Sequence, residues 1–220
     1  MLLDFDGPVC SIFAGYPAPR VAGELVALLD VEGVDVPPEV RSERDPLAVL
    51  RWVGEACSPD LTAAVEEALC AAELHAASVA APTPFGREVI LGARARGVPV
   101  AVVSNNSAAA IEAYLSAHGL AEFVSPIVGR PYAAPWRMKP DPGPLLDAAS
   151  ALEAAPESCA LIGDSLSDIE AARAAGVAAI GYANRAWKVE AFAAADIVIT
   201  SMGAVAEALS PVTPVSREGD

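Results

Sequence analysis

The chain has 220 residues, of which 54% are hydrophobic but only 5% aromatic, and a formal net charge of −15. Nucleic-acid partners require clustered Lys and Arg, so this acidic balance argues against a nucleic-acid-binding protein. No run of about 18 apolar residues is free of charge and proline, which argues against a membrane protein. Four cysteines without CxxC spacing indicate reduced thiols and predict a cytoplasmic location.

The chain opens with a short apolar run, Met1-Leu2-Leu3, that leads into Asp4-Phe5-Asp6-Gly7. In open α/β sheets ligands bind at the carboxyl ends of the strands, so both carboxylates are expected at one sheet edge. Such a pair can attack phosphorus and move the leaving-group proton, although a helix cap or a solvated loop explains a short acidic turn equally well. Because only three residues precede Asp4, we expect a short first strand and a native start upstream of Met1.

A long helical segment follows this motif. From Pro19 to about Ala81 the apolar residues recur at spacings of three and four, and no strand pattern interrupts them. Gly- and Pro-containing segments at residues 15–19 and 82–84 bracket this stretch. We therefore predict an all-helical cap over residues 16–81, mobile relative to a core made of residues 1–15 and 82–210.

Beyond Pro84, short apolar runs alternate with amphipathic helices. This alternation predicts an α/β fold with a doubly wound parallel sheet, because each crossover connection needs a helix on one face of the sheet. Residues 211–220 contain proline and charge and are predicted to form a disordered tail.

Polar residues follow several of these apolar runs. Ser104-Asn105 comes directly after Val102-Val103, and Gly163-Asp164 comes directly after Ile162, with Asp168 four residues further on. Lys139 stands before Pro140-Asp141-Pro142 and is one of only two lysines, the other being Lys188. The scarcity of lysine makes the position of Lys139 informative.

Together these four pieces, in this order and with a cap-sized insert after the first, resemble the haloacid dehalogenase-like hydrolase superfamily with an inserted helical cap. The resemblance runs from Leu2 to about Leu209 and is nearest to the phosphoglycolate phosphatase-like and β-phosphoglucomutase-like branch. It implies a Mg²⁺-dependent phosphomonoester hydrolase that acts on a small phosphorylated metabolite through an aspartyl phosphate.

The resemblance also implies roles for individual residues. Asp4 would be the nucleophile and Asp6 the acid and base, while Ser104 and Lys139 would stabilise the phosphoryl group. The metal would be held by four acids, with Asp6 contributing its backbone carbonyl: Asp4, Asp6, Asp164 and Asp168. Asp168 could instead pair with Lys139 or act as a first-turn acid, and Ser104 could instead cap the next helix.

Three further residues are candidates for substrate binding: Gly7, Asn105 and Arg51. Arg51 belongs to the cap, where several arginines could meet a carboxylate or a second phosphate. The family usually has Thr after Asp-x-Asp-Gly, whereas Pro8 stands here and leaves Asp6 without that hydroxyl. The absence of a cap lysine argues against a phosphonate hydrolase, and Asp6 with Asp164 argues against a dehalogenase. A phosphosugar mutase and a non-catalytic phospholigand-binding module are the alternatives that stay open.

Overall fold

The computed structural model describes residues 1–210, and the predicted disordered tail lies outside them. All six strands of the main sheet are parallel and lie in the order β5-β4-β1-β6-β7-β8. The strands are β1 (Leu2–Leu3), β4 (Ala101–Val103), β5 (Ile127–Val128), β6 (Ala160–Gly163), β7 (Ala178–Tyr182) and β8 (Ile197–Ile199). The chain first moves outward to β4 and β5 and then returns to place β6 beside β1. The carboxyl ends of β1 and β6 therefore flank the switch point where such sheets bind ligands.

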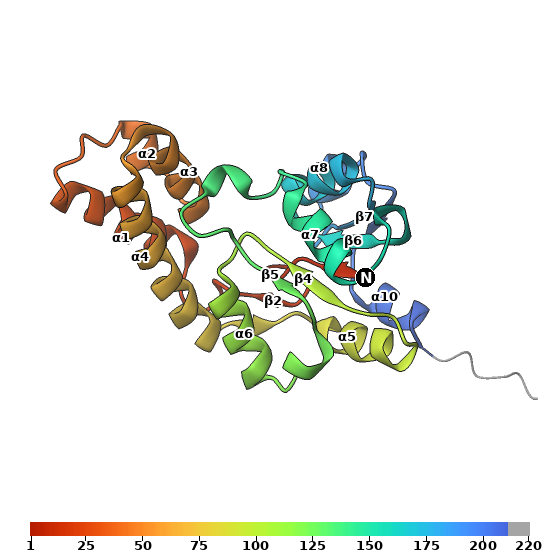
Figure 1. Ribbon diagram of the computed structural model, residues 1–220. Coiled ribbons are helices and arrows are strands. Elements are labelled where there is room, and N and C mark those ends of the chain that lie inside the picture. The colour runs from red at the N-terminus through yellow and green to blue at the C-terminus, as the bar shows by residue number, and fades with distance from the viewer. Residues whose placement is uncertain (211–220) are drawn as a thin grey trace, which may run out of the picture.

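Helices cover both faces of this sheet, which confirms the predicted α/β fold (Figure 1). One face packs against α5 (Gly86–Ala95), α6 (Ala108–Ala117) and α10 (Gly203–Ala208), and the other against α7 (Gly143–Ala151) and α8 (Leu166–Ala175). Because successive strand residues point to opposite faces, Leu3 belongs to the first apolar cluster and Leu2 to the second. Burial on both faces explains why these strands are almost entirely apolar in sequence.

Four helices between β2 and β3 form the inserted cap (Figure 1). They are α1 (Ala18–Val31), α2 (Pro38–Arg41), α3 (Pro46–Ala56) and α4 (Pro59–Ser78). The Asp45 side chain caps α3 and the Ser58 side chain caps α4, each just before a proline in the first helical turn. The cap has an apolar cluster of its own.

Helix α4 belongs to the packing of both parts of the molecule. Its Val65 and Leu69 lie in the apolar cluster of the cap, whereas Ala76 and Ala77 lie in a cluster of the sheet core. The same helix packs against α6 of the core. The predicted cap boundary at residues 81/82 and the predicted mobility of the cap stay predictions.

The sequence analysis missed a second, two-stranded sheet. Strands β2 (Cys10–Ser11) and β3 (Ala81–Pro82) pair antiparallel at the two points where the chain leaves and re-enters the core. Each has only two residues, too few to show an alternating pattern. The remaining short helices are η1 (Ala121–Phe123), η2 (Pro135–Arg137), η3 (Pro156–Ser158) and α9 (Lys188–Ala191).

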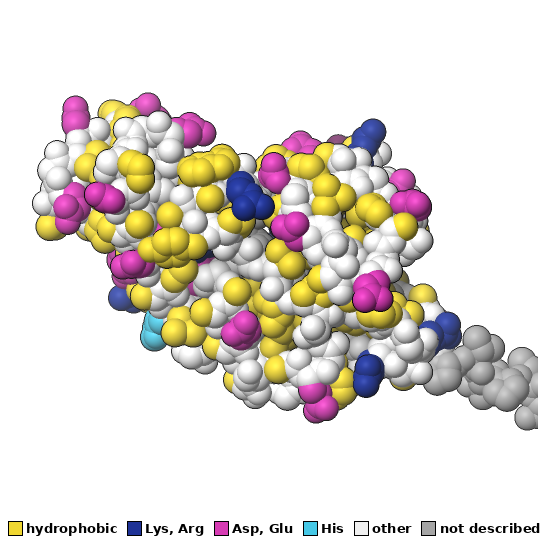
Figure 2. All heavy atoms as spheres, in the orientation of Figure 1, with side chains coloured by type: hydrophobic (Ala, Val, Ile, Leu, Met, Phe, Trp, Pro, Cys, Tyr) yellow, Lys and Arg dark blue, Asp and Glu magenta, His cyan; other side chains and the backbone are white. Residues whose placement is uncertain are grey.

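Acidic side chains are scattered over both the cap and the core and outnumber the basic ones on the face shown in Figure 2. This distribution agrees with the net charge of −15. Within residues 1–210, no helix combines the length and the apolar character that crossing a membrane requires.

Candidate active site

Asp4 and Asp6 lie at the carboxyl end of β1, in the interior of the sheet. The Asp4 N–H donates to the Ile162 carbonyl at 2.9 Å, so pairing with β6 continues beyond the end of β1. Asp4 is buried, whereas Asp6 keeps part of its surface exposed. The Asp6 carboxylate accepts a hydrogen bond from the Ile12 N–H at 3.0 Å. The backbone just after β2 therefore orients Asp6, which lacks the hydroxyl of a following threonine because Pro8 stands at that position.

Gly7 is required by its surroundings. Its φ is +106°, and a Cβ at this position would lie 2.4 Å from Cγ of Asp164. The Gly7 N–H donates to the Cys10 carbonyl at 2.7 Å, and the Gly7 carbonyl accepts from the Thr83 hydroxyl. The Gly7 amide is thus used inside the turn, and Gly7 matters here for the close approach of Asp164.

Lys139 joins three segments of the core. Its Nζ lies 2.9 Å from Asp4 Oδ1 and 2.6 Å from Asp168 Oδ1, and it donates to the Val103 carbonyl at 2.8 Å. The side chain is almost fully buried. The three contacts fix the ammonium group between the carboxyl ends of β1, β4 and β6.

Asp168 lies in the first turn of α8 and is completely buried. It forms a reciprocal capping box with Ser165, whose side chain accepts the Asp168 N–H while the Asp168 carboxylate accepts the Ser165 N–H. Gly163 leaves room for it, because a Cβ there would lie 2.4 Å from the Asp168 side chain. Asp168 therefore caps its helix and pairs with Lys139, both of which the sequence allowed.

Asp164, directly after β6, has two partners that the sequence analysis did not assign to it. Its Oδ2 accepts hydrogen bonds from Lys188 Nζ at 2.7 Å and from Asn184 Nδ2 at 2.8 Å. Lys188 Nζ also donates to the Asp164 carbonyl at 2.6 Å. Lys188 therefore lies at the same edge of the sheet as Lys139.

Three acids are arranged so that they could share a cation: Asp4, Asp164 and Asp168. Each offers one carboxylate oxygen within 4.8 Å of the others. Mg²⁺ prefers such oxygen donors, so the donor set fits the cation that the resemblance implies. The Asp6 carboxylate stands outside this group and is held by Ile12, which is compatible with a ligand role for its backbone carbonyl.

Burial shifts the pKa values of the acids in this site. It raises the pKa of Asp4 to about 7, against the opposing effect of the Lys139 charge. It also raises the pKa of Asp6 to about 6, although the hydrogen bond from Ile12 opposes the shift. Burial lowers the pKa of Lys139, but the carboxylates of Asp168 and Asp4 outweigh it, so the net pKa is raised and the lysine stays charged.

Ser104 and Asn105 follow β4 and complete this edge of the sheet. The Ser104 hydroxyl donates to Asn106 Oδ1 at 3.2 Å. It does not cap α6, whose N-cap residue is Ser107. The Asn105 side chain is engaged on both sides by the Lys139 backbone, at 2.9 Å and 3.1 Å. Asn105 therefore fixes the segment that carries Lys139.

A cavity of about 640 Å³ opens above these residues, between the core and the cap. Its core side includes the acids, Ser104 and Lys139. Its cap side is lined mainly by residues of α3 and of the segment just before it, including two arginines and two acids: Arg44, Arg51, Glu43 and Asp45. Arg51 Nη2 donates to the Lys139 carbonyl at 3.3 Å. The structure thus brings every predicted site residue to this cavity except Gly7, which lies in the adjoining turn.

This arrangement places a buried ammonium group, the two acids of the first motif and a metal-compatible carboxylate set at the switch point of a parallel sheet. The chain belongs to the haloacid dehalogenase-like hydrolase family, which residues 2–176 match. The fold and the family agree with the resemblance that the motifs carry.

Two curated relatives share 36% identity with parts of the chain. One is a bifunctional riboflavin kinase/FMN phosphatase of Arabidopsis thaliana, matched over 54% of this chain and 31% of its own length. The other is a phosphoglycolate phosphatase of Escherichia coli K12, matched over 41% of this chain and 36% of its own length. The matches span about a third of these relatives.

Solved structures show the same fold over nearly the whole chain. CbbY from Rhodobacter sphaeroides in complex with phosphate has a TM-score of 0.70 at 24% identity, covering 91% of this chain and 93% of its own. A β-phosphoglucomutase from Clostridium difficile has a TM-score of 0.69 at 18% identity, covering 92% and 91%.

Proposed function

We propose that the protein is a Mg²⁺-dependent phosphomonoester hydrolase that acts on a small phosphorylated metabolite through an aspartyl phosphate on Asp4. The observation that carries this proposal is the position of Lys139 Nζ, 2.9 Å from Asp4 Oδ1 and 2.6 Å from Asp168 Oδ1, at a cavity also lined by Asp6 and Asp164. The phosphatase names of the two curated relatives support the same class of reaction.

In the first step an oxygen of Asp4 attacks phosphorus, and the bond from phosphorus to the ester oxygen breaks. Asp6 donates its proton to the leaving oxygen, and the raised pKa of about 6 keeps part of this acid protonated near neutral pH. Asp6 then takes a proton from the water that attacks the aspartyl phosphate. This second step releases inorganic phosphate and regenerates Asp4.

The remaining residues bind charge and hold geometry. Lys139 neutralises the nucleophile and the phosphoryl oxygens, and the Ser104 hydroxyl, which donates to Asn106 Oδ1 in this structure, would turn its one proton to them. The carboxylates of Asp4, Asp164 and Asp168 would hold Mg²⁺, which when bound offsets the charge of the acids and of the phosphoryl group.

On the cap side, Arg51 is proposed to contact the part of the substrate beyond the phosphate. It lines the cavity together with Arg44, and neither arginine forms an ion pair within residues 1–210. A second anionic group on the substrate would complement them. A cytoplasmic location, supported by the free cysteines among the described residues, belongs to the same proposal.

The proposal is tested by measuring inorganic phosphate released from a panel of phosphate monoesters. The panel contains phosphoglycolate, FMN, a hexose 1-phosphate and an aryl phosphate, each with Mg²⁺ and with a chelator. We expect release that depends on Mg²⁺. The Asp147→Asn variant is the control, because this exposed acid lies on α7, away from the cavity.

Other outcomes would identify the alternatives. Conversion of the hexose 1-phosphate into an isomer without phosphate release would make the protein a mutase. Binding of inorganic phosphate without turnover of any ester would make it a phospholigand-binding module. Undiminished turnover in excess chelator would contradict the metal role.

A further inference from the structure

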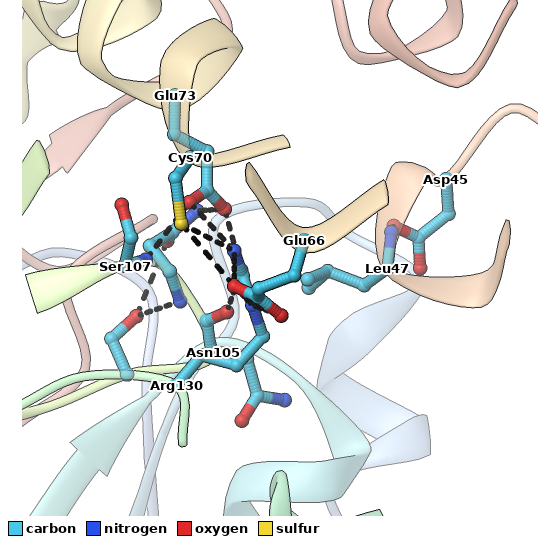
Figure 3. A network of polar contacts seen from close by, with 10 residues as sticks. Asp45, Leu47, Glu66, Cys70, Glu73, Asn105, Ser107 and Arg130 are labelled. Carbon is cyan, nitrogen blue, oxygen red and sulfur yellow. Dashed lines mark hydrogen bonds and ion pairs between the residues drawn. The ribbon is translucent and has the colours of Figure 1, made fainter. Parts of the chain in front are cut away.

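A second buried ionic cluster connects the cap to the core, centred on Arg130 just after β5 (Figure 3). Its guanidinium group lies between two acids of α4. Arg130 Nη2 is 2.7 Å from Glu66 Oε1, and Arg130 Nη1 is 2.8 Å from Glu73 Oε1. The side chains of all three residues are at most 1% exposed. Cys70, between the two acids on the same helix, lies 3.7 Å from Arg130 Nη2.

This cluster, which we call the α4 clamp (Glu66, Glu73 and Arg130), also holds the segment that follows β4. Glu73 accepts the Asn106 side-chain N–H at 3.0 Å and the Ser107 backbone N–H at 2.9 Å. Arg130 Nη1 donates to the Asn105 carbonyl at 2.7 Å. The clamp is therefore bonded to three successive residues of this segment.

The contacts reach the candidate phosphate-binding hydroxyl in one further step. Asn106, held by Glu73, accepts the Ser104 hydroxyl at 3.2 Å and donates its backbone N–H to the same oxygen at 3.3 Å. Ser104 in turn lines the active-site cavity beside Lys139. A continuous path of hydrogen bonds thus leads from a cap helix to the catalytic edge of the sheet.

Stability alone is a poor explanation for this arrangement. Removing three charges from water is expensive, and well-packed apolar residues of similar volume often stabilise a protein as well as a buried ion cluster does. Apolar side chains, however, could not accept the Ser107 N–H at the start of α6 or orient the Asn106 amide. The carboxylate of Glu73 does both, and it meets the positive end of the α6 dipole.

We propose that Glu73 and Arg130, supported by Glu66, are positioning residues that hold the Ser104–Ser107 segment in the geometry needed to bind a phosphoryl group. The inference rests on the proposed function for its catalytic consequence. Because both acids stand on α4, a cap that swung away as a rigid body would pull them from Arg130 and loosen this segment. Docking of the cap and order at the phosphate site are in this way linked.

The main test replaces the clamp by apolar side chains in the variant Glu66→Met/Glu73→Met/Arg130→Met. We expect the melting temperature to fall, because the buried Ser107 N–H and Asn106 amide lose their acceptor, and activity is therefore measured well below it. We also expect kcat on an aryl phosphate to fall by about 10- to 100-fold, since a displacement of about 1 Å costs that much. The dissociation constant for inorganic phosphate should rise by about 10-fold, as expected when a charge-assisted contact is lost.

A second variant keeps the three charged side chains of the clamp and removes only the hydrogen bonds that connect Glu73 to Ser104. Asn106→Ala leaves the three charges paired but removes the link between Glu73 and Ser104, so it should reproduce the loss of phosphate affinity with little change in melting temperature. The matched control is Leu69→Ala on the same helix, because Leu69 is fully buried in the apolar cluster of the cap and is not a member of the clamp. This control should lower the melting temperature and leave kcat unchanged well below it.

Amide hydrogen exchange at Ser107 separates this inference from the proposed function, because it requires no substrate. Exchange should accelerate by about 10-fold or more in the triple variant and stay unchanged in Leu69→Ala. If the unchanged protein hydrolyses no ester but this pattern holds, the proposed function fails and the clamp stands. If kcat, phosphate affinity and Ser107 exchange all survive in both the triple variant and Asn106→Ala, the inference is overturned.

Discussion

Two buried clusters contact the Ser104–Ser107 segment, and each pairs one base with two acids. In the α4 clamp, every nitrogen of the Arg130 guanidinium has an acceptor, and the two carboxylates are closed off from solvent. In the catalytic cluster, Lys139 Nζ binds Oδ1 of both Asp4 and Asp168, and Asp4 still lines the cavity. The first cluster is saturated, whereas the second keeps an acid available to a ligand.

The choice of base matches this difference. Arginine presents a rigid planar fork that suits two fixed carboxylates at once, which favours it where geometry must be held. Lysine is a compact charge on a flexible stem, which suits a site where an oxygen atom must be shared with an incoming phosphoryl group. Similar charge composition therefore serves a structural link in one cluster and a proposed reactive site in the other.

Loss of activity should be greatest when the proposed nucleophile Asp4 is replaced. Asp4→Asn should lower kcat by about 10³-fold or more, because no oxygen of the amide can form the aspartyl phosphate. The melting temperature in chelator should be equal or higher, since burial raises the pKa of Asp4 and the ionised acid is poorly tolerated there. Phosphate release and thermal unfolding measure the two effects. Activity within a few-fold of the unchanged protein would remove Asp4 from this role.

Replacing each base by the other type, in Lys139→Arg and Arg130→Lys, tests whether the two clusters differ in kind. Lys139→Arg should lower kcat by about 10²-fold, because the wider guanidinium must displace neighbours in a packed site. Arg130→Lys should have a smaller effect, about 10-fold, since the three donors of an ammonium group cannot replace all the contacts that Nε, Nη1 and Nη2 of the planar guanidinium make with the two acids and the Asn105 carbonyl. Both are measured as kcat on an aryl phosphate, with circular dichroism to verify folding. Equal effects would mean that the two clusters do not differ in kind.

The sequence predicts the catalytic cluster far better than the clamp, for a physical reason. Asp4, Ser104 and Asp164 directly follow apolar runs, and the carboxyl ends of parallel strands must meet at one edge of the sheet. Lys139 stands out because lysine is rare in this chain. The order of the motifs then identifies the family, and the fold follows.

The sequence contains no comparable pattern that would predict the clamp. Its acids lie 57 and 64 residues from Arg130 in the sequence. Acids on an amphipathic helix are ordinarily assigned to a solvated face, and only the packing of α4 on α6 buries them. The contact of Lys188 with Asp164 was missed for a similar reason, because it depends on the path of the chain after β7. These features depend on tertiary contacts rather than on local pattern.

Lys188 places a second base beside Asp164 at the edge of the sheet where Lys139 lies. Lys188→Met should lower the Mg²⁺ concentration needed for half-maximal binding by roughly 10-fold, since a positive charge beside Asp164 Oδ2 is removed. Asn184→Ala should raise that concentration, because Asn184 orients the same oxygen without charge. Calorimetric titration with Mg²⁺ measures both shifts. Weaker Mg²⁺ binding in Lys188→Met would show that the lysine supports the site rather than competing with the cation.

In the absence of a cation, the free energy of unfolding should depend only modestly on pH through Asp6. The pKa of Asp6 is raised from 3.8 to about 6 by burial, so between these pH values the folded chain holds more protons than the unfolded chain. Its contribution to stability is therefore present at low pH and is lost as pH rises toward 6. Because Asp6 is partly exposed, we expect a loss on the order of 1–2 kcal/mol.

Asp6→Asn isolates this contribution. The variant should lose less stability than the unchanged protein between pH 4.5 and about 7, as measured by urea unfolding in chelator. Added Mg²⁺ should stabilise the unchanged protein more at pH 7.5 than at pH 5, because the cation binds the deprotonated acids. Arg130 should contribute nothing to this difference, since its raised pKa keeps the guanidinium charged across the range. The same pH slope in Asp6→Asn and in the unchanged protein would show that Asp6 titrates normally and is not the proton donor that the burial of the site predicts.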